Sequence, residues 1–358
     1  MNRSEGKIEP VREDWMSVAI DLSKRGYPAP NPHVGCVIVS DGEAVGVGYH
    51  DRAGGPHAET MALAKAGPRA KGATAYVTLE PCNHEGRTGP CSVALIEAGI
   101  TRVVFALKDP NSVASGGAAR LAEAGIEVIS GCMASEAEAA NIKWLTAVRR
   151  RRPYLVAKAA LTLDGRIALP NGQSQWITSV ASRRQGHVLR AECGAVLVGR
   201  GTVHNDDPEL TVRHLEVVNQ PTRIVVDPLG RLARSHRVFD GTAPVLHVVQ
   251  DARDEFQVQA KAEAGGFDLR DLLAQIYSRG ITSILVEGGA KTIGGFVSEG
   301  LVDRFELFVG PILFGDGPSW LQMASPAKVI DATRLQIERV ETNEGDLWIT
   351  ALPGTPIG

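Results

Sequence analysis

The chain has 358 residues, of which 44% are hydrophobic and 22% charged, so a folded protein of about two domains is expected. The chain has 38 Lys and Arg against 41 Asp and Glu, and its net charge of −3 argues against a dedicated nucleic-acid or anionic-membrane binder. Only 5% of the residues are aromatic, which disfavours surfaces that stack on bases. The first residues carry acids and no apolar run of signal-peptide type, and no segment approaches the ~20 apolar residues of a membrane span. We therefore expect a cytoplasmic protein.

The first 130 residues predict an α/β layered domain with several parallel strands. Apolar residues at helical spacing, or bounded by glycine and proline stop signals, predict helices over residues 15–24, 57–66, 91–98 and 117–124. Compact apolar runs bounded by turn signals predict strands over residues 34–39, 44–49, 73–79, 102–107 and 126–129.

A run of four arginines and a proline, residues 149–153, precedes a second α/β pattern. We interpret this run as a solvated interdomain segment rather than a nucleic-acid patch, because neither half of the chain has a basic excess. The predicted domains are residues 1–148 and 154–358, joined by the linker 149–153. In the second domain, strands are expected over residues 154–160, 195–198, 223–226, 245–249, 283–286 and 304–309. Helices are expected over residues 181–192, 269–279 and 292–299, and a C-terminal hairpin over residues 335–341 and 346–352.

His57, Cys82 and Cys91 form the most informative pattern in the first domain. Zinc deaminases use one His and two Cys ligands with a nearby Glu that does not bind the metal, and Glu59 stands two residues after His57. Three protein ligands leave one tetrahedral position open for water, and Zn²⁺ lowers the pKa of that water toward ~7. Glu59 would accept the proton of the water and return it to the leaving ammonia.

The spacing of these residues leaves alternatives for the third ligand. The short form Pro-Cys-x-x-Cys would place it at Glu85, and His84 is a further option, whereas the next cysteine, Cys91, comes nine residues after Cys82. Thiolate preference favours Cys91. Ordinary buried Cys and His residues are the alternative to a metal site, but the ordered set together with Glu59 favours zinc.

The segment Pro81–Cys91, PCNHEGRTGPC, resembles the extended zinc loop of the bifunctional riboflavin-biosynthesis deaminase/reductase family. Residues 31–39 and 54–59 resemble further deaminase motifs of that family. The resemblance implies a three-layer domain like that of the zinc cytidine deaminases, acting on 2,5-diamino-6-ribosylamino-4(3H)-pyrimidinone 5′-phosphate. It also implies substrate contacts from Asn31, His84, Arg87 and Thr88, of which the Arg87 guanidinium suits a phosphate.

The second domain resembles the reductase half of the same family, so the resemblance covers nearly the whole chain. The stretches that carry it are residues 158–166, 174–179, 199–213 and 286–289. It implies a dihydrofolate-reductase-like fold, NADPH as the cofactor, and reduction of the ribosyl group to ribityl by hydride delivery to C1′. Family members associate through this domain, so a homo-oligomer is expected.

Candidate nucleotide and substrate residues follow from the family motifs by position. On the residues alone, the glycine-rich stretch 287–295 follows a strand and opens a helix, so its N–H groups can cradle a phosphate, although it lacks the G-x-G-x-x-G pattern. The resemblance places the nucleotide against Ala160, Trp176, Thr202, Asp206, Pro228, Gly289, Ala290, Lys291, Thr292, Ile293, Gly294 and Gly295. It places the substrate against Ser174, Arg190, Leu210, Arg213 and Glu287. The proton-handling candidates, which the sequence leaves unranked, are Lys158, Asp206 and Glu287.

Two other functions remain open at this point. In one, the chain is a deaminase whose reductase domain is inactive or serves only in assembly. In the other, the chain is an RNA-directed deaminase, which its acidic balance disfavours. The expected partner is therefore a small ribosylaminopyrimidine phosphate, with neither nucleic acid nor membrane.

Overall fold

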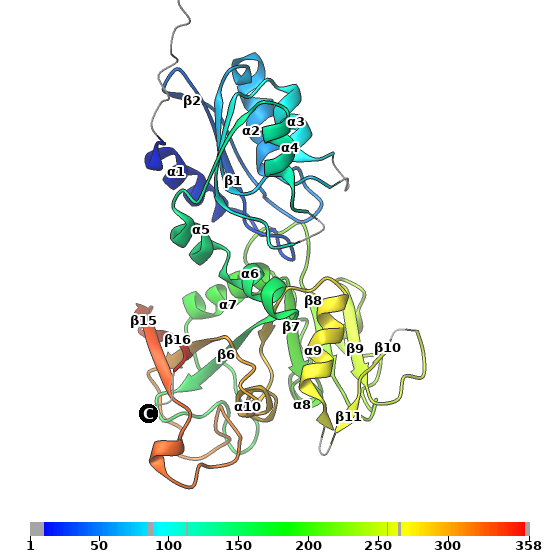
Figure 1. The fold of residues 1–358 in the computed structure, drawn as a ribbon. Coiled ribbons are helices and arrows are strands. Elements are labelled where there is room, and N and C mark those ends of the chain that lie inside the picture. The colour runs from blue at the N-terminus through cyan, green and yellow to red at the C-terminus, as the bar shows by residue number, and fades with distance from the viewer. Residues whose placement is uncertain (1–10, 85–88, 112–113, 256, 264–265, 355–358) are drawn as a thin grey trace, which may run out of the picture. The chain divides into compact units, whose positions relative to one another are not determined.

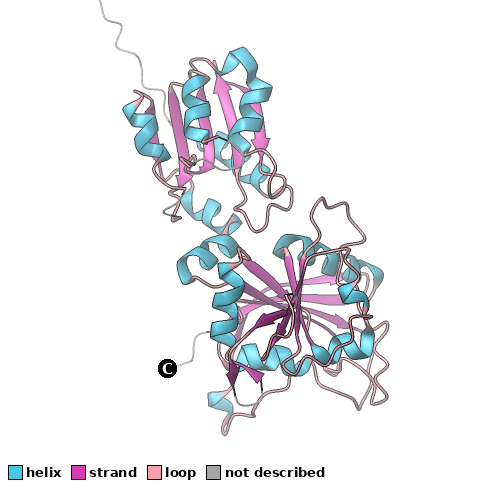
Figure 2. Cartoon of the chain, turned by 90° about the vertical axis from the view of Figure 1, so that its right-hand side faces the viewer, coloured by secondary structure: helices cyan, strands magenta, loops and turns pink. Residues whose placement is uncertain are grey.

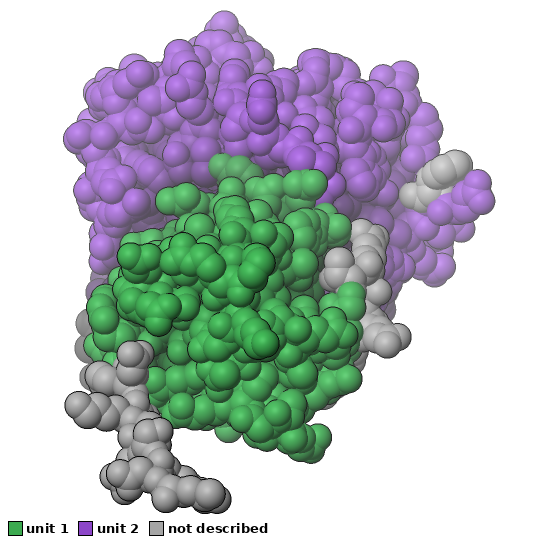
Figure 3. All heavy atoms as spheres, turned by 90° about the horizontal axis from the view of Figure 1, so that it is seen from above, with its two compact units in different colours: residues 1–149 green, residues 150–358 purple. Residues whose placement is uncertain are grey.

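The protein is described from a computed structural model that defines residues 11–84, 89–111, 114–255, 257–263 and 266–354. By its internal packing, the chain divides into unit 1, residues 1–149, and unit 2, residues 150–358 (Figure 3). The predicted linker, residues 149–153, spans this division.

Unit 1 is built on a five-stranded sheet in the order β2-β1-β3-β4-β5 (Figure 1). Its strands are β1 (Gly35–Ser40), β2 (Glu43–Tyr49), β3 (Thr74–Leu79), β4 (Arg102–Leu107) and β5 (Glu127–Ser130). The β1 strand runs antiparallel to both neighbours, whereas β3, β4 and β5 are parallel, which confirms the expectation of several parallel strands. The carboxyl ends of β3 and β4 therefore lie at the same edge of the sheet.

Helices cover both faces of this sheet, so unit 1 has three layers (Figures 1 and 2). Alternate residues of β1 serve the two faces, since Cys36 and Ile38 belong to one core cluster and Val37 and Val39 to the other. The first core is closed by α2 (Ala58–Ala66), the one-turn η1 (Gly67–Ala70), α3 (Cys91–Glu97) and α4 (Gly117–Glu123). The second is closed by α1 (Glu13–Ser23), α5 (Ala134–Ala140) and α6 (Ile142–Arg150).

Two glycines of β2 set the position of α2. A Cβ atom at Gly48 would lie 2.1 Å from the carbonyl oxygen of Ala58, and one at Gly46 would lie 2.2 Å from that of Ala62. The absence of side chains at these positions lets the helix lie directly on the strand. The start of α2, which follows the candidate metal ligand His57 and carries the candidate base Glu59, is thereby held against the sheet.

Unit 2 contains a nine-stranded sheet in the order β10-β9-β8-β7-β13-β6-β14-β16-β15. Its strands are β6 (Tyr154–Thr162), β7 (Ala195–Gly199), β8 (Thr222–Val226), β9 (Val245–Val249), β10 (Gln257–Gln259), β13 (Ser283–Val286), β14 (Arg304–Gly310), β15 (Leu335–Asn343) and β16 (Asp346–Pro353). The first seven strands in this order, β10-β9-β8-β7-β13-β6-β14, are all parallel. The predicted C-terminal hairpin of β15 and β16 adds two antiparallel strands beside β14. A separate two-stranded ribbon consists of β11 (Ala262–Glu263) and β12 (Gly266–Phe267).

The helices of unit 2 are α7 (Val180–Cys193), α8 (Arg200–Asp206), α9 (Leu269–Ser278) and α10 (Ala290–Ser298), with one-turn helices η2 (Arg237–Phe239) and η3 (Val329–Asp331). Ser179 and Asp268 cap α7 and α9 by accepting backbone N–H groups with their side chains. Among the described residues, none of the helices of either unit is both long and apolar enough to cross a bilayer.

Three α-helices of the described residues, α5, α6 and α8, were not predicted from the sequence. The α5 segment is rich in alanine and glutamate and offers few large apolar residues, and α8 contains a glycine and β-branched residues of low helix propensity. The α6 helix continues through Arg150, into the segment interpreted as a solvated linker. Arg150 and Arg152 both form ion pairs with Asp303, whose side chain is only 6% exposed; Arg150 stays 58% exposed, whereas Arg152 is 15% exposed.

Candidate active sites

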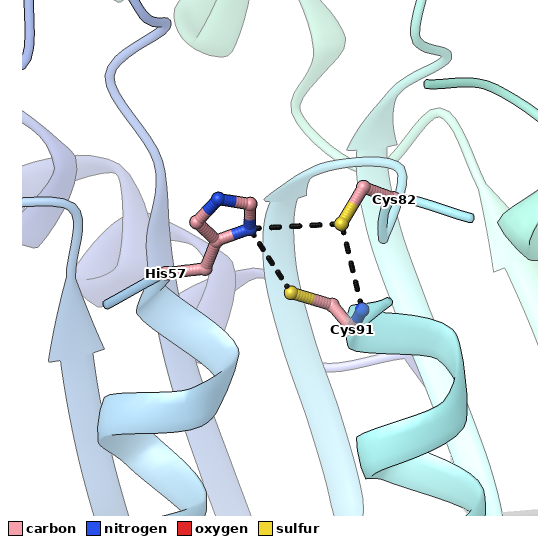
Figure 4. Close-up of side chains that lie close together, drawn as sticks. All are labelled: His57, Cys82 and Cys91. Atoms are coloured by element: carbon pink, nitrogen blue, oxygen red, sulfur yellow. Dashed lines mark hydrogen bonds between the residues drawn. The ribbon is translucent and has the colours of Figure 1, made fainter. Parts of the chain in front are cut away.

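The three predicted metal ligands converge at one edge of the unit 1 sheet (Figure 4). His57 directly precedes α2, Cys82 follows β3, and Cys91 is the first residue of α3. His57 Nδ1 lies 3.2 Å from Cys91 Sγ and 3.6 Å from Cys82 Sγ. The backbone N–H of Cys91 donates to Cys82 Sγ at 3.4 Å, and that of Ser92 donates to the Cys82 carbonyl at 3.2 Å.

This geometry fits zinc. Zn–S and Zn–N bonds of usual length at tetrahedral angles place a sulfur and a nitrogen ligand roughly 3.5 Å apart, close to the observed separations. The hydrogen bond with Cys91, together with one from His57, lowers the pKa of Cys82, which favours the thiolate form that binds a metal. All five cysteines of the chain, each within the described residues, are free thiols.

Glu59 lies in the first turn of α2 and is 3% exposed. Burial, reinforced by the nearby charge of Cys82, raises its pKa to about 7. A carboxyl group that exchanges its proton near neutral pH suits the base and acid of a hydrolytic step.

A cavity of about 220 Å³ opens beside these residues. Its lining includes His57, Cys82 and Glu59 together with the predicted substrate residues Asn31 and His84. The Nδ1 atom of His84 is buried without a hydrogen-bond partner in the described part of the chain, as expected of a group that binds a ligand. The predicted contacts at Arg87 and Thr88, and the alternative ligand Glu85, lie outside the described residues.

The cavity also contains residues that sequence reasoning missed. His50 Nδ1 donates to the Pro56 carbonyl at 3.0 Å, and its Nε2 lies 3.0 Å from Asn31 Nδ2, so the ring is a neutral acceptor of the Asn31 amide. Asp109 also lines the cavity, and burial raises its pKa to about 6. His50 directly follows β2 and Asp109 comes two residues after β4, so the rule that ligands bind at strand ends could have found them.

His33 lies outside the cavity lining. Its Nδ1 lies 2.9 Å from the Ser23 carbonyl, and its backbone N–H and C=O both bond to the side chain of Asn141 at 2.8 Å. This residue therefore fixes the loop that carries Asn31.

In unit 2, two of the three proton-handling candidates, Lys158 and Glu287, lie close together. The Arg190 guanidinium donates to both carboxylate oxygens of Glu287, at 2.6 and 3.0 Å, and Lys158 Nζ lies 3.9 Å from Glu287 Oε2. Burial raises the pKa of Glu287, but the charges of Arg190 and Lys158 outweigh it and lower that pKa to about 2. Burial lowers the pKa of Lys158. Asp206, whose pKa burial raises, makes no hydrogen bond or ion pair with either within the described residues.

Arg190 and Arg213 bring two positive charges to the same neighbourhood. Arg190 Nη1 donates to the carbonyl of Thr211 at 2.9 Å. Arg213, with a side chain 49% exposed, forms an ion pair with Glu209 at 2.7 Å. Partial burial and the charge of Arg190 both lower the pKa of Arg213, so a bound anion would be stabilised there.

The predicted phosphate loop is only partly exposed to a ligand. Gly289 precedes the first turn of α10, and its carbonyl accepts the N–H groups of Thr292 at 2.9 Å and Ile293 at 3.2 Å. Ile293 is 2% exposed, and a Cβ at Gly294 would lie 1.9 Å from the carbonyl oxygen of Gln322. The Ile293 side chain and Gly294 therefore pack the helix, and the nucleotide contacts of residues 289–295 stay a prediction that concerns the backbone of this loop.

Other nucleotide candidates lie near the carboxyl ends of neighbouring strands of the large sheet. Thr202, Pro228 and Gly289 follow the ends of β7, β8 and β13, which are parallel neighbours, and Ala160 lies near the end of the adjoining β6. An extended nucleotide fits such an edge, so these residues suit NADPH. The carbonyl of Pro228 already accepts the N–H of Gln250 at 2.9 Å, which leaves mainly ring packing for a ligand.

Three further candidates differ in accessibility. Trp176 is 66% exposed with the Arg183 guanidinium 4.4 Å from its ring centroid, and Ser174 is partly exposed. The Leu210 side chain, in contrast, is 3% exposed and packs in a core cluster, so its predicted substrate contact would come from its backbone.

Comparison with known proteins decides the family. Residues 153–349 match the family described as RibD C-terminal domain, and residues 10–107 match the cytidine and deoxycytidylate deaminase zinc-binding region. Riboflavin biosynthesis protein RibD of Aquifex aeolicus is 44% identical over 322 residues, covering 87% of this chain and 90% of that protein. The Escherichia coli RibD is 43% identical, with coverage of 92% and 95%. The chain belongs to the RibD family.

Solved structures of the family agree with the fold. An Acinetobacter baumannii RibD structure has a TM-score of 0.88 at 37% identity, covering 96% of this chain and 99% of that one. A Thermotoga maritima structure, named as a diaminohydroxyphosphoribosylaminopyrimidine deaminase/5-amino-6-(5-phosphoribosylamino)uracil reductase, has a TM-score of 0.84 at 36% identity, with coverage of 96% and 98%. These matches confirm the expected cytidine-deaminase-like domain followed by a dihydrofolate-reductase-like domain. The chain is thus a bifunctional deaminase and reductase of riboflavin biosynthesis, with zinc and NADPH as cofactors.

Proposed function

We propose that unit 1 hydrolytically deaminates 2,5-diamino-6-ribosylamino-4(3H)-pyrimidinone 5′-phosphate, and that unit 2 reduces the ribosyl group of the product to ribityl. The observation that carries this proposal is the convergence of His57, Cys82 and Cys91 beside the buried Glu59. The name of the Thermotoga maritima relative, whose fold extends over both units, supports the substrate.

In unit 1, His57, Cys82 and Cys91 would hold zinc, which supplies Lewis acidity that activates water near neutral pH. Glu59 takes a proton from the attacking water and delivers it to the leaving amine, so ammonia departs. The His50 ring keeps the Asn31 amide in one orientation, and a fixed amide can distinguish donor from acceptor positions on a pyrimidine edge.

In unit 2, the first turn of α10 would hold phosphate groups of NADPH, which supplies the hydride when bound. Glu287 is ionised and therefore does not donate a proton in the reduction. Its charge instead holds Arg190 and Lys158 in place. Lys158 Nζ, with its lowered pKa, donates the proton that the opening sugar oxygen requires, and Arg213 binds the 5′-phosphate.

The proposal also covers the oligomeric state of the protein and its location in the cell. On the family resemblance, the chain works in the cytoplasm as a homo-oligomer associated through unit 2. Sedimentation of the full chain and of a variant lacking unit 1 should give the same subunit number.

A coupled assay with the diaminopyrimidine ribosyl phosphate tests both activities, because ammonia release and NADPH oxidation are followed separately. Cys91→Ser should lose most zinc and all deamination but retain NADPH binding and reduction of supplied deaminated substrate. Full zinc retention in this variant would overturn the ligand set. Ammonia release without NADPH binding by the wild type would favour an inactive reductase domain, and salt-dependent RNA binding would favour an RNA-directed deaminase.

A further inference from the structure

The segment that carries Arg213 is held by side chains rather than by a sheet. Residues 209–213 belong to no helix or strand, so their backbone groups need other partners. The Gln220 side chain accepts the N–H of Val212 at 2.8 Å and donates to its carbonyl at 3.1 Å. His187 Nδ1 accepts the N–H of Arg213 itself at 3.3 Å. The direction in which Arg213 leaves the backbone therefore depends on His187.

His187 belongs to the same face of α7 as Arg190, three residues later, and is 6% exposed. Its ring packs edge-on against His214, with centroids 4.6 Å apart. An acceptor Nδ1 requires the neutral ring with its proton on Nε2. Burial, followed by the charges of Arg190, Arg213 and His214, lowers the pKa of His187 to about 4 against the opposite influence of Glu287, so this form persists at neutral pH.

We propose that His187 is a positioning residue of the reductase site: its neutral imidazole holds the Arg213 backbone so that the guanidinium meets the 5′-phosphate of the substrate. This inference rests on the proposed function, in which Arg213 binds that phosphate. His187 itself does not touch the reacting atoms. Its loss should therefore weaken recognition of the phosphate and leave hydride transfer to a bound substrate unchanged.

Two polar substitutions of His187 separate a positioning role from a merely structural one. In Asn the side-chain oxygen takes about the place of imidazole Nδ1, whereas in Gln the terminal atoms take that of Nε2. His187→Asn should accept the Arg213 N–H and remain within twofold of wild type. His187→Gln and His187→Leu should raise KM for the phosphorylated substrate about threefold to tenfold, as expected for the loss of one neutral hydrogen bond.

The experiment uses the full chain, supplied with deaminated substrate and with its dephosphorylated form, and follows NADPH oxidation. The preference for the phosphorylated form should shrink in His187→Gln, while KM for NADPH, kcat and ammonia release stay at wild-type values. Adding His187→Gln to Arg213→Ala should have no further effect, because the two changes act on the same contact. Equal behaviour of the Asn and Gln variants, or additive effects in the double variant, would overturn the role of His187. An unchanged KM in Arg213→Ala alone would instead refute the proposed phosphate contact.

Discussion

Replacing Glu287 by Gln tests the charge arrangement of the reductase site. Burial raises the pKa of Glu287, but the charges of Arg190 and Lys158 lower it from 4.5 to about 2. This lowering of the pKa corresponds to roughly 3 kcal/mol of stability for the folded state of unit 2. Because the folded pKa lies below the unfolded one, this stability is present above about pH 4.5 and is lost as the pH falls toward 2.

Glu287→Gln should therefore destabilise unit 2 by about 3 kcal/mol at pH 7. The difference in unfolding free energy between the variant and the wild type should become smaller as the pH falls below about 4.5. Urea unfolding read by pulsed hydrogen exchange of peptides from β13 and α7 reports on unit 2 alone. Glu341→Gln is the matched control, because its ion pair with Arg339 is exposed at both partners and should contribute less than about 1 kcal/mol. A Glu287→Gln variant as stable as the control, or a gap that does not change with pH, would refute the reasoning.

Three further predictions concern unit 1 and the independence of the units. Glu59→Gln should keep zinc but lower ammonia release by about 10²- to 10⁴-fold, and a loss of less than tenfold would contradict its role as base. Gly48→Ala should lower both the melting temperature and the zinc content of unit 1, because the new Cβ would lie 2.1 Å from the Ala58 carbonyl oxygen. NADPH binding should not change. Unchanged zinc content and stability would count against this packing. A fragment ending near Arg150 should deaminate and one starting near Arg152 should reduce deaminated substrate, and a soluble, zinc-loaded N-terminal fragment without deaminase activity would disprove that independence.

The metal site could be predicted from the sequence because its signal is local. His57 and Glu59 are two residues apart at the start of α2, Cys82 follows β3 and Cys91 begins α3, and these elements have strong sequence patterns. The regular strands could be predicted for the same reason, because their apolar runs are bounded by clear turn signals. His50 was missed because a single histidine after a strand carries no motif, although its position at the strand end is informative.

The reductase site could be located by resemblance but not resolved from the sequence. Arg190 and Glu287 are 97 residues apart in the chain, and only the parallel sheet brings them into a bidentate pair. Leu210 and Ile293 stand within motifs yet turn into the core, because motif position does not specify which way a side chain points. The hydrogen bond from Arg213 to His187 involves a backbone group, which no residue pattern encodes.

The hydrogen bonds between the two cysteine ligands have a consequence for how this site can change. Cys91 and Ser92 donate to the sulfur and the carbonyl of Cys82, so the two ends of the intervening segment are fastened to each other independently of what lies between them. The entropy of closing a loop grows only slowly with its length. Changes between the two cysteine ligands should thus cost the metal ligands little, and His84, which lines the cavity, makes the beginning of this segment the natural place to redesign the choice of pyrimidine substrate.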